Sequence, residues 1–328
     1  MLKRFVFEIE DRPRQRWRER FAQGREEAER WYFGQGRARP AIASECRRAL
    51  GQHMPELVPL YDEACRQVGD DALAHCVISQ YRPPPAAGGC SQLIWLGDGG
   101  PALIRNYDFP IDVVSDRFEL TAWFDAKVIA KAQRPWGGCL DGMNEYGLVA
   151  STTLGGNAAL GEGFAIILML RYVLETCRQV DQAVAALSVI PIAQSQNVTL
   201  LDRSGDYATL FLGPDRKPEC SQLRVCTNHQ TLTEPPASAA VVRSVERQEV
   251  LLAALADPSA TLVKLINRFF EPPIYSKRAQ SPTVYTAVYR PTEGRVDYLW
   301  PGMCRSQGFG KFTCGEYTHD YGQLFEDA

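Results

Sequence analysis

Cys90, Arg105 and Asp108 are the residues whose types and spacing most clearly suggest chemistry in this sequence. Cys90 begins an apolar segment, and Arg105 and Asp108 lie near the end of a second apolar segment that follows an Asp-Gly-Gly-Pro turn. This pattern predicts a β-hairpin, and the two strands of a hairpin lie about 5 Å apart. We therefore expect a thiol, a guanidinium and a carboxylate to be neighbours, with the guanidinium lowering the pKa of the thiol.

Cys90 would also carry its own base if the chain were cut between Gly89 and Cys90. A free α-amino group has an ordinary pKa of about 7.7–8.0, close to that of a working base at neutral pH. Attack of the thiol on the Gly89 carbonyl would shift the acyl group from nitrogen to sulfur, and Gly88 and Gly89 allow the backbone bend that this needs. The alternative interpretation is a buried, inert cysteine beside a surface ion pair of Arg105 and Asp108.

The composition is that of a globular protein, with 45% hydrophobic and 23% charged residues in a chain of 328. This length suits one large domain or two ordinary ones. The net charge of −3 provides no general attraction to nucleic acid or to an anionic membrane. Glu residues offset the arginines of segment 12–39, which favours a solvated amphipathic helix there. We expect neither a nucleic-acid partner nor a membrane partner.

The sequence shows no targeting or metal-binding pattern. Its first residues do not resemble a signal peptide, and the apolar run 164–174 is too short for a bilayer and contains Arg171. This run therefore predicts a buried helix. The ten cysteines form no C-x-x-C pair, which argues against a zinc site and favours mostly reduced, buried thiols. We expect a cytoplasmic protein that requires no metal and no organic cofactor.

The spacing of apolar residues predicts helices early in the chain and mostly strands afterwards. Because the strands are joined by short turns, we expect antiparallel sheets flanked by helices, not a parallel βαβ fold. The expected elements are a strand over 2–9, helices over 11–80, a loop over 81–89, strands within 90–109, 116–133 and 137–154, helices over 163–188, a hairpin over 197–213, a strand over 222–230, helices over 238–270 and a hairpin over 283–302.

Five motifs in a fixed order resemble those of the N-terminal-nucleophile (Ntn) cysteine amidohydrolases. The resemblance is to the acyl-coenzyme A:6-aminopenicillanate acyltransferase (peptidase C45-like) group and the related choloylglycine hydrolases, and it extends from about Met54 to about Gly302. The motifs are GGCSQLIWLGDGGPALIRNYDFP, DGMNEYGLVAS, NVTLLDRSGDYATLFL, VCTNHQ and SVERQEVLLAAL.

The resemblance implies an α+β fold, a four-layer αββα sandwich of two antiparallel sheets with an N-terminal helical segment. It also implies that the precursor is cut into two pieces of one integrated domain. Residues 1–89 would form a small helical fragment, and residues 90–328 would form the catalytic core. The long segment before Cys90 suits the acyltransferase branch, because choloylglycine hydrolases lose far less ahead of their cysteine.

Roles for individual residues follow from the same resemblance. Cys90 matches the nucleophile, Asp108 the acid that orients the free amine, and Arg105 the basic residue near the thiolate. Asn228 matches the asparagine whose amide contributes to the oxyanion hole. Arg247 matches the arginine behind the site, with Arg243 as a nearby alternative.

Further positions have weaker assignments. A second oxyanion donor is expected around Thr152 to Leu154, with Thr153 and Leu154 as substrate-binding residues. His229 is interpreted as structural, because a cut enzyme of this type needs no histidine. Asp141, together with the following Asn144 and Glu145, is interpreted as turn chemistry.

The implied activity is that of a self-processing amidohydrolase or acyltransferase. It would cleave or transfer the acyl group of a linear small-molecule amide, at its C–N bond, through an S-acyl intermediate on Cys90. The active form would be a heterodimer with its own cleaved N-terminal fragment, and a higher oligomer is compatible with the sequence. The alternatives are a bile-salt or acyl-homoserine-lactone amide hydrolase of the same fold, and an unprocessed, non-catalytic binding module.

Overall fold

The computed structural model describes residues 1–10, 12–33, 41–86, 88–124, 126–133, 137–230, 240 and 242–325. Parts of the predicted helical regions, at 11, 34–40, 238, 239 and 241, lie outside the described residues. The helices are α1 (Gln15–Phe33), α2 (Ala43–His53), the 3-10 helix η1 (Pro55–Leu57), α3 (Val58–Val68), α4 (Ala72–Ser79), α5 (Ile166–Thr176), α6 (Val180–Val189), α8 (Ser244–Ala256) and α9 (Leu262–Arg268).

The strands form two sheets. The nine-stranded sheet has the order β10 (Glu219–Ser221), β9 (Tyr207–Leu212), β8 (Gln196–Leu201), β7 (Val149–Leu154), β6 (Gly138–Asn144), β5 (Val128–Gln133), β4 (Arg117–Thr121), β1 (Leu2–Ile9) and β15 (Gly315–Asp320). The six-stranded sheet has the order β11 (Val225–Cys226), β2 (Gly89–Trp95), β3 (Ala102–Asp108), β12 (Thr283–Arg290), β13 (Arg295–Trp300) and β14 (Met303–Gly308).

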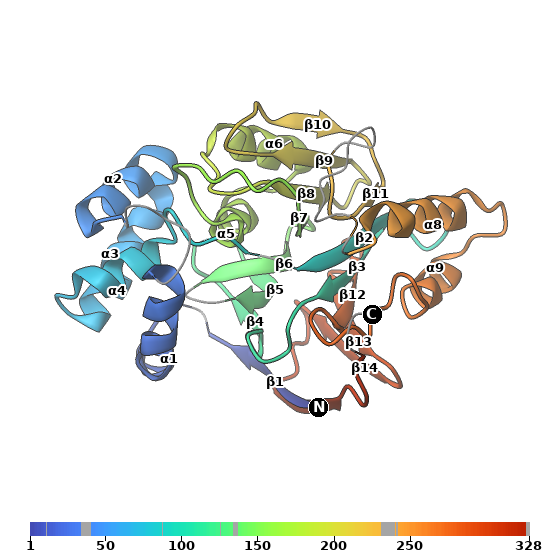
Figure 1. Cartoon of the computed structure of the whole chain (residues 1–328), viewed down its shortest axis with the longest axis horizontal. Helices are drawn as coiled ribbons and strands as arrows, with labels where there is room; N and C mark the ends of the chain where they lie inside the picture. The colour runs from blue at the N-terminus through green and yellow to red at the C-terminus, as the bar shows by residue number, and fades with distance from the viewer. Residues whose placement is uncertain are drawn as a thin grey trace.

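The two sheets pack face to face, and helices cover their outer faces (Figure 1). Helices α5 and α6 lie on the nine-stranded sheet, and α8 lies on β2 and β11 of the six-stranded sheet. A separate apolar cluster joins Leu93 and Ile104 of that sheet to Leu251 of α8 and Leu265 of α9. The structure therefore confirms the predicted αββα sandwich. The expectation of purely antiparallel sheets is wrong in one place, because β1 pairs with β4 in parallel.

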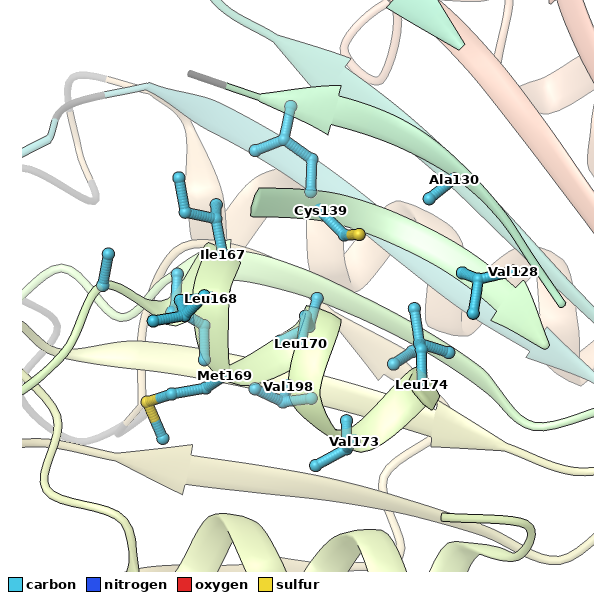
Figure 2. Packing of buried hydrophobic residues seen from close by; sticks show 14 of the residues in the cluster. Val128, Ala130, Cys139, Ile167, Leu168, Met169, Leu170, Val173, Leu174 and Val198 are labelled. Atoms are coloured by element: carbon cyan, nitrogen blue, oxygen red, sulfur yellow. The ribbon is translucent and has the colours of Figure 1, made fainter. Parts of the chain in front are cut away.

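The apolar run 164–174 forms α5, as predicted. Figure 2 shows side chains of α5, including Leu170 and Leu174, packed beside strand residues such as Val128 and Cys139. The run is apolar almost all round because the helix is covered on most sides, with nine of its residues buried. This packing fixes α5 against β6, which carries residues of the site described below.

Arg171 is tolerated within α5 because its charge is neutralised by buried partners. Its Nη1 atom lies 3.2 Å from Glu175 Oε1 and donates to Thr121 Oγ1 at 2.6 Å. Its guanidinium also lies 4.5 Å from the centre of the Trp123 ring. These contacts of the buried arginine hold the helix against the C-terminal end of β4.

The N-terminal segment is partly integrated into the core. Helices α1 to α4 pack on one another at one end of the molecule (Figure 1), but β1 lies between β4 and β15. Val6, for example, pairs with Arg117 on one side and Glu316 on the other. Residues 1–89 therefore contribute a strand to the larger sheet, so a fragment ending at Gly89 would remain hydrogen-bonded to the rest.

Strands β14 and β15 were not predicted. The segments Met303–Gly308 and Gly315–Asp320 are mostly exposed and contain few β-branched or apolar residues. Their strand conformation depends on pairing with β13 and β1, respectively. Such pairing is a tertiary interaction that the local sequence does not indicate.

Replacing Phe118 with alanine is expected to lower the free energy of unfolding by about 3–5 kcal/mol. Phe118 is fully buried and stacks on Phe7 of β1 with ring centres 4.8 Å apart, and its ring centre lies 4.2 Å from that of Tyr298 in the other sheet. Urea unfolding followed by circular dichroism would measure the loss. Leu2→Ala, at a side chain that is 69% exposed, is the control and should change stability by less than about 0.5 kcal/mol.

Candidate active site

Cys90, Arg105 and Asp108 lie together on the hairpin of β2 and β3. Cys90 pairs with Tyr107, and Gly89 pairs with Asp108. The Nη2 atom of Arg105 lies 3.4 Å from the Cys90 sulfur. Because side chains alternate along a strand, Arg105 shares the inner face of the sheet with Cys90, whereas Asp108 lies on the helix-covered face. The expected proximity is confirmed, with the acid on the other side of the backbone.

Asn228 and Arg247 reach the backbone of Cys90 from outside the hairpin. Asn228 Oδ1 accepts a hydrogen bond from the Cys90 backbone N–H at 2.8 Å. Arg247, on α8, donates to Asn228 Oδ1 at 2.7 Å, to the Cys90 carbonyl at 2.5 Å and to Ser91 Oγ at 2.6 Å. The alternative, Arg243, instead pairs with exposed Glu246. Arg247 thus fixes both the nucleophile candidate and the asparagine beside it.

Burial dominates the electrostatics of the site in the uncut chain. It raises the pKa of the Cys90 thiol above its ordinary value, and Arg105 offsets only part of that rise. The expected lowering of the thiol pKa is therefore wrong for the continuous chain. The free energy lost when the thiolate is removed from water exceeds the stabilisation that one guanidinium provides. Burial also raises the pKa of Asp108, whose Oδ1 accepts from Thr283 Oγ1 at 2.7 Å, while Arg247 opposes the rise.

Asp141 is a site residue that the sequence analysis misassigned. It is fully buried in β6, and its Oδ1 lies 2.9 Å from Arg105 Nη1. The same carboxylate accepts hydrogen bonds from the hydroxyls of Tyr285 and Tyr289. The reading as turn chemistry is wrong for Asp141, but it holds for Asn144, which accepts from two backbone N–H groups of the following turn.

A β-bulge explains why Asp141 points inward. Lys131 pairs with Asp141 but Ala132 pairs with Cys139, so Leu140 is one extra residue in β6. Its carbonyl accepts from Arg105 Nη1 at 2.7 Å. A bulge shifts the alternation of side chains and frees backbone groups from the ladder. Its location cannot be read from the apolar pattern alone, so the pairing of Asp141 with Arg105 had no clear sequence signal.

The segment from Thr152 to Leu154 lies opposite Asn228. Asn228 Nδ2 donates to the Leu154 carbonyl at 3.3 Å. Thr153 Oγ1 donates to the Thr227 carbonyl at 2.7 Å, and Asn197 Nδ2 donates to Thr153 Oγ1 at 3.1 Å. The predicted substrate-binding segment is therefore held beside the Thr-Asn-His segment by a buried polar network.

His229 has protein partners at both ring nitrogens. Nδ1 lies 2.8 Å from Ser244 Oγ, and Nε2 lies 3.1 Å from Gln248 Oε1. Burial lowers the pKa of the ring. An imidazole with both nitrogens engaged by the protein is poorly placed to act as a base, which agrees with the structural interpretation.

A mainly apolar cavity of about 350 Å³ opens beside Cys90. The residues that line it include Ala28, Pro84, Tyr107, Leu140, Phe164 and Ile167. Among its described lining residues, the charged side chains are Arg105 and the exposed Glu27. Part of the wall comes from α1 and from residues 83–86, 88 and 89, so the N-terminal segment helps to form the cavity.

The loop before Cys90 is pinned to the core. Gln194 accepts a hydrogen bond from the Ala86 N–H and donates one to the Ala86 carbonyl, both at 2.9 Å. Farther upstream, the Arg82 N–H donates to the Gly163 carbonyl at 2.7 Å. These contacts hold residues 82 and 86 against the core beside the cavity.

A family model described as acyl-coenzyme A:6-aminopenicillanic acid acyl-transferase matches residues 95–303, more than half of the chain. The chain belongs to this family. Arg105, Asp108, Asn228 and Arg247 lie within the matched residues of this acyltransferase-family chain, and Cys90 lies just before them. The resemblance to the acyltransferase family that was predicted from the motifs is thereby confirmed. A comparison with curated proteins finds no match.

Solved structures similar to this acyltransferase-family chain share little sequence with it. A variant of the conjugated bile acid hydrolase from Clostridium perfringens is 13% identical, with 73% of this chain and 99% of that chain covered and a TM-score of 0.49. Penicillin V acylase from Agrobacterium tumefaciens is 16% identical, with coverages of 68% and 87% and a TM-score of 0.48. A Caenorhabditis elegans orthologue of N-acylethanolamine-hydrolyzing acid amidase is 13% identical, with coverages of 62% and 93% and a TM-score of 0.46.

Two features are absent from the described part of the chain. None of the helices is both long enough and apolar enough to cross a membrane. Within the same part of the chain, no three or more His, Cys, Asp and Glu side chains gather in a way that could hold a metal ion.

Proposed function

We propose that the protein is a self-processing cysteine amidohydrolase or acyltransferase that acts on linear amides with an apolar acyl group. One observation carries the proposal. Cys90 lines an apolar cavity and places its sulfur beside Arg105, while its backbone N–H donates to Asn228. A cut before Cys90 would turn that nitrogen into an amine on the same residue as the thiol.

The proposed cut begins with attack of the Cys90 sulfur on the Gly89 carbonyl carbon. The C–N bond between Gly89 and Cys90 breaks, and the thiol proton passes to the leaving nitrogen. Water then hydrolyses the thioester, leaving a carboxylate on Gly89 and both a free thiol and a free amine on Cys90. The tight packing of Gly88 supports a requirement for glycine, because a Cβ there would lie 2.6 Å from the ring of Phe109.

In turnover, the Cys90 amine would accept the thiol proton and return it to the amine product as the S-acyl enzyme forms. Asp108 is suited to orient the new ammonium group. Its Oδ2 would lie 3.3 Å from a Cβ on Gly89, directly beside the bond that breaks. Water or an acceptor amine then takes the acyl group from sulfur.

The oxyanion of the substrate would be held by Asn228 Nδ2 and by the backbone N–H of Leu154. The N–H of Gly155 donates to the Ser195 carbonyl. Backbone groups of adjacent strand residues point in opposite directions, so the Leu154 N–H faces the side on which Asn228 lies. We therefore assign the second donor to Leu154, with Thr153 positioning the strand.

The cavity suits the acyl part of the substrate. Its volume of about 350 Å³ lies at the small end of ligand pockets, and its lining is mainly apolar. A neutral aliphatic or aromatic acyl group fits such a lining. A charged acyl group would lose its hydration there, and the buried cation of the lining, Arg105, is already paired with Asp141.

N-terminal sequencing and intact-mass measurement of the purified protein test the proposal. We expect two fragments, the larger beginning Cys-Ser-Gln-Leu-Ile, and release of acid from apolar acyl amides. A single uncut species, with Cys90 inert to iodoacetamide and no turnover, would instead favour a binding module.

Filling the cavity from the N-terminal segment is expected to shorten the preferred acyl group. Ala28 of α1 lines the cavity, so Ala28→Phe should lower kcat/KM about fourfold for each methylene that no longer fits. A series of straight-chain acyl amides would reveal this dependence on length. Ala22→Phe adds the same ring at an exposed position of α1, and we expect it to leave the series unchanged.

A further inference from the structure

We infer that Asp141, together with Tyr285 and Tyr289, is a positioning group that sets both the orientation and the effective charge of Arg105 at the Cys90 sulfur. The inference rests on the proposed role of Cys90 as the nucleophile. It assigns a function to three buried side chains that come from strands of both sheets and that are linked to the sulfur through Arg105.

One end of the Arg105 guanidinium is bound by protein groups other than Cys90. Nη1 donates to the Leu140 carbonyl at 2.7 Å and lies 2.9 Å from Asp141 Oδ1, whereas Nη2 reaches the Cys90 sulfur at 3.4 Å. The guanidinium is planar and rigid, so fixing Nη1 and the side-chain stem determines where Nη2 points. Asp141 therefore controls the direction from which positive charge approaches the thiol.

Asp141 is in turn held from the opposite sheet. Tyr289 donates to its Oδ2 at 2.8 Å, and Tyr285 donates to its Oδ1. Arg105, Asp141 and Tyr289 are 0% exposed, and Tyr285 is 1% exposed. In such a dry site a carboxylate without these donors would be far less stable, so the two hydroxyls are part of what keeps the ion pair in place.

The same contacts determine how much positive potential Arg105 exerts at the sulfur. The negative charge of Asp141 cancels part of the positive potential of Arg105. Hydrogen bonds from the two tyrosine hydroxyls stabilise that negative charge and weaken its effect on Arg105. Removing the charge of Asp141 should therefore stabilise the thiolate, and removing a tyrosine hydroxyl should destabilise it. The two kinds of variant are expected to act in opposite directions.

Other ionisable groups near Cys90 also act on the charge of its sulfur, and none of them is changed in these variants. Arg105 and Asp108 come from β3, Arg247 from α8 and Cys226 from β11. The free α-amine would add a further charge in the cut protein. Because these groups are the same in all the variants, a difference in the alkylation midpoint between variants reports the effect of Asp141 and its two tyrosine partners.

The test is the pH dependence of Cys90 alkylation by iodoacetamide, followed at the level of the Cys90 peptide by mass spectrometry. Peptide resolution is needed because Cys220, Cys304 and Cys314 are exposed. For Asp141→Asn, which keeps an acceptor for Arg105, we expect the midpoint to move about 0.5–1 pH unit toward acid. For Tyr285→Phe and Tyr289→Phe, we expect a smaller shift toward alkali.

Tyr321→Phe is the matched control. Tyr321 is also a buried tyrosine, but its hydroxyl donates to the Val284 carbonyl and not to Asp141. It should leave the midpoint unchanged. The acidic limb of the kcat/KM profile should move with the alkylation midpoint in each variant, with little change in KM.

The possible outcomes separate this inference from the proposed function. Shifts of opposite sign, in a wild-type protein that is cut before Cys90, support both. A cut, active wild type whose variants show no shift, or shifts of one sign, overturns the positioning role alone. A wild-type Cys90 that is uncut and inert at every pH overturns the proposed function and this inference with it. If Asp141→Asn does not fold, the alkaline shift of the two tyrosine variants relative to Tyr321→Phe decides the question.

Discussion

Replacing Cys90 with alanine is expected to leave the chain uncut and to reduce amide turnover by about 10⁵-fold or more. The reason is that one substitution removes both the sulfur that attacks Gly89 and, because no cut occurs, the free amine that serves as the base. Denaturing electrophoresis and intact-mass measurement would report the cut, and release of acid from an apolar acyl amide would report turnover. The fold should persist, since the cavity left by one sulfur is small.

Cys139→Ala is the control for this variant. Cys139 is also buried and lies in β6 beside α5 (Figure 2), but it is not one of the residues that line the cavity. We expect it to be cut and active like the wild type. A Cys90→Ala protein that still yields a fragment beginning at residue 90, or that retains turnover, would show that the nucleophile lies elsewhere.

Replacing Asn228 with aspartate is expected to lower kcat by about 10²–10³-fold with little change in KM. Aspartate keeps the oxygen that accepts from the Cys90 N–H and from Arg247, but it lacks the Nδ2 donor. The loss would thus fall on stabilisation of the oxyanion, which exists only as the reaction proceeds. Steady-state kinetics on already cut protein would measure it.

Asn267→Asp makes the same chemical change at an exposed position of α9, and it should have no kinetic effect. An Asn228→Asp protein with unchanged kcat would exclude Asn228 as an oxyanion donor. An increase in KM alone would indicate that the residue only helps to bind the ground state.

The proximity of Cys90, Arg105 and Asp108 was predictable because it is local. The Asp-Gly-Gly-Pro turn brings β2 and β3 into register, so the two ends of a short segment must meet. It was less predictable on which face of the sheet each of these side chains would lie. Arg105 lies with Cys90, but Asp108 lies on the other side of the sheet, and burial outweighs Arg105 in determining the pKa of the thiol.

Asn228 and Arg247 were predicted through the resemblance of their motifs and not through their spacing. They are 138 and 157 residues away from Cys90, and no local rule places residues at such separations in contact. The structure brings them to Cys90 because β11 pairs with β2 and α8 packs on both strands. Strands β14 and β15 show the same limit, since each depends on a partner to form.

The sequence by itself determined the family, the alternation of helices and hairpins, and the thiol–guanidinium pair. The pair depends on residue order within one hairpin, and the other two depend on short motifs and apolar patterns that follow one another along the chain. Only the tertiary structure decided that Asp141 turns inward at the Leu140 bulge, meets Arg105, and is held by two tyrosines of the other sheet. It also decided the shape of the cavity, whose wall combines α1 with the core. The physical reason is that the packing of two sheets brings together residues that are far apart in the sequence. The stability of each buried contact then depends on all the residues that surround it, and not on its own segment alone.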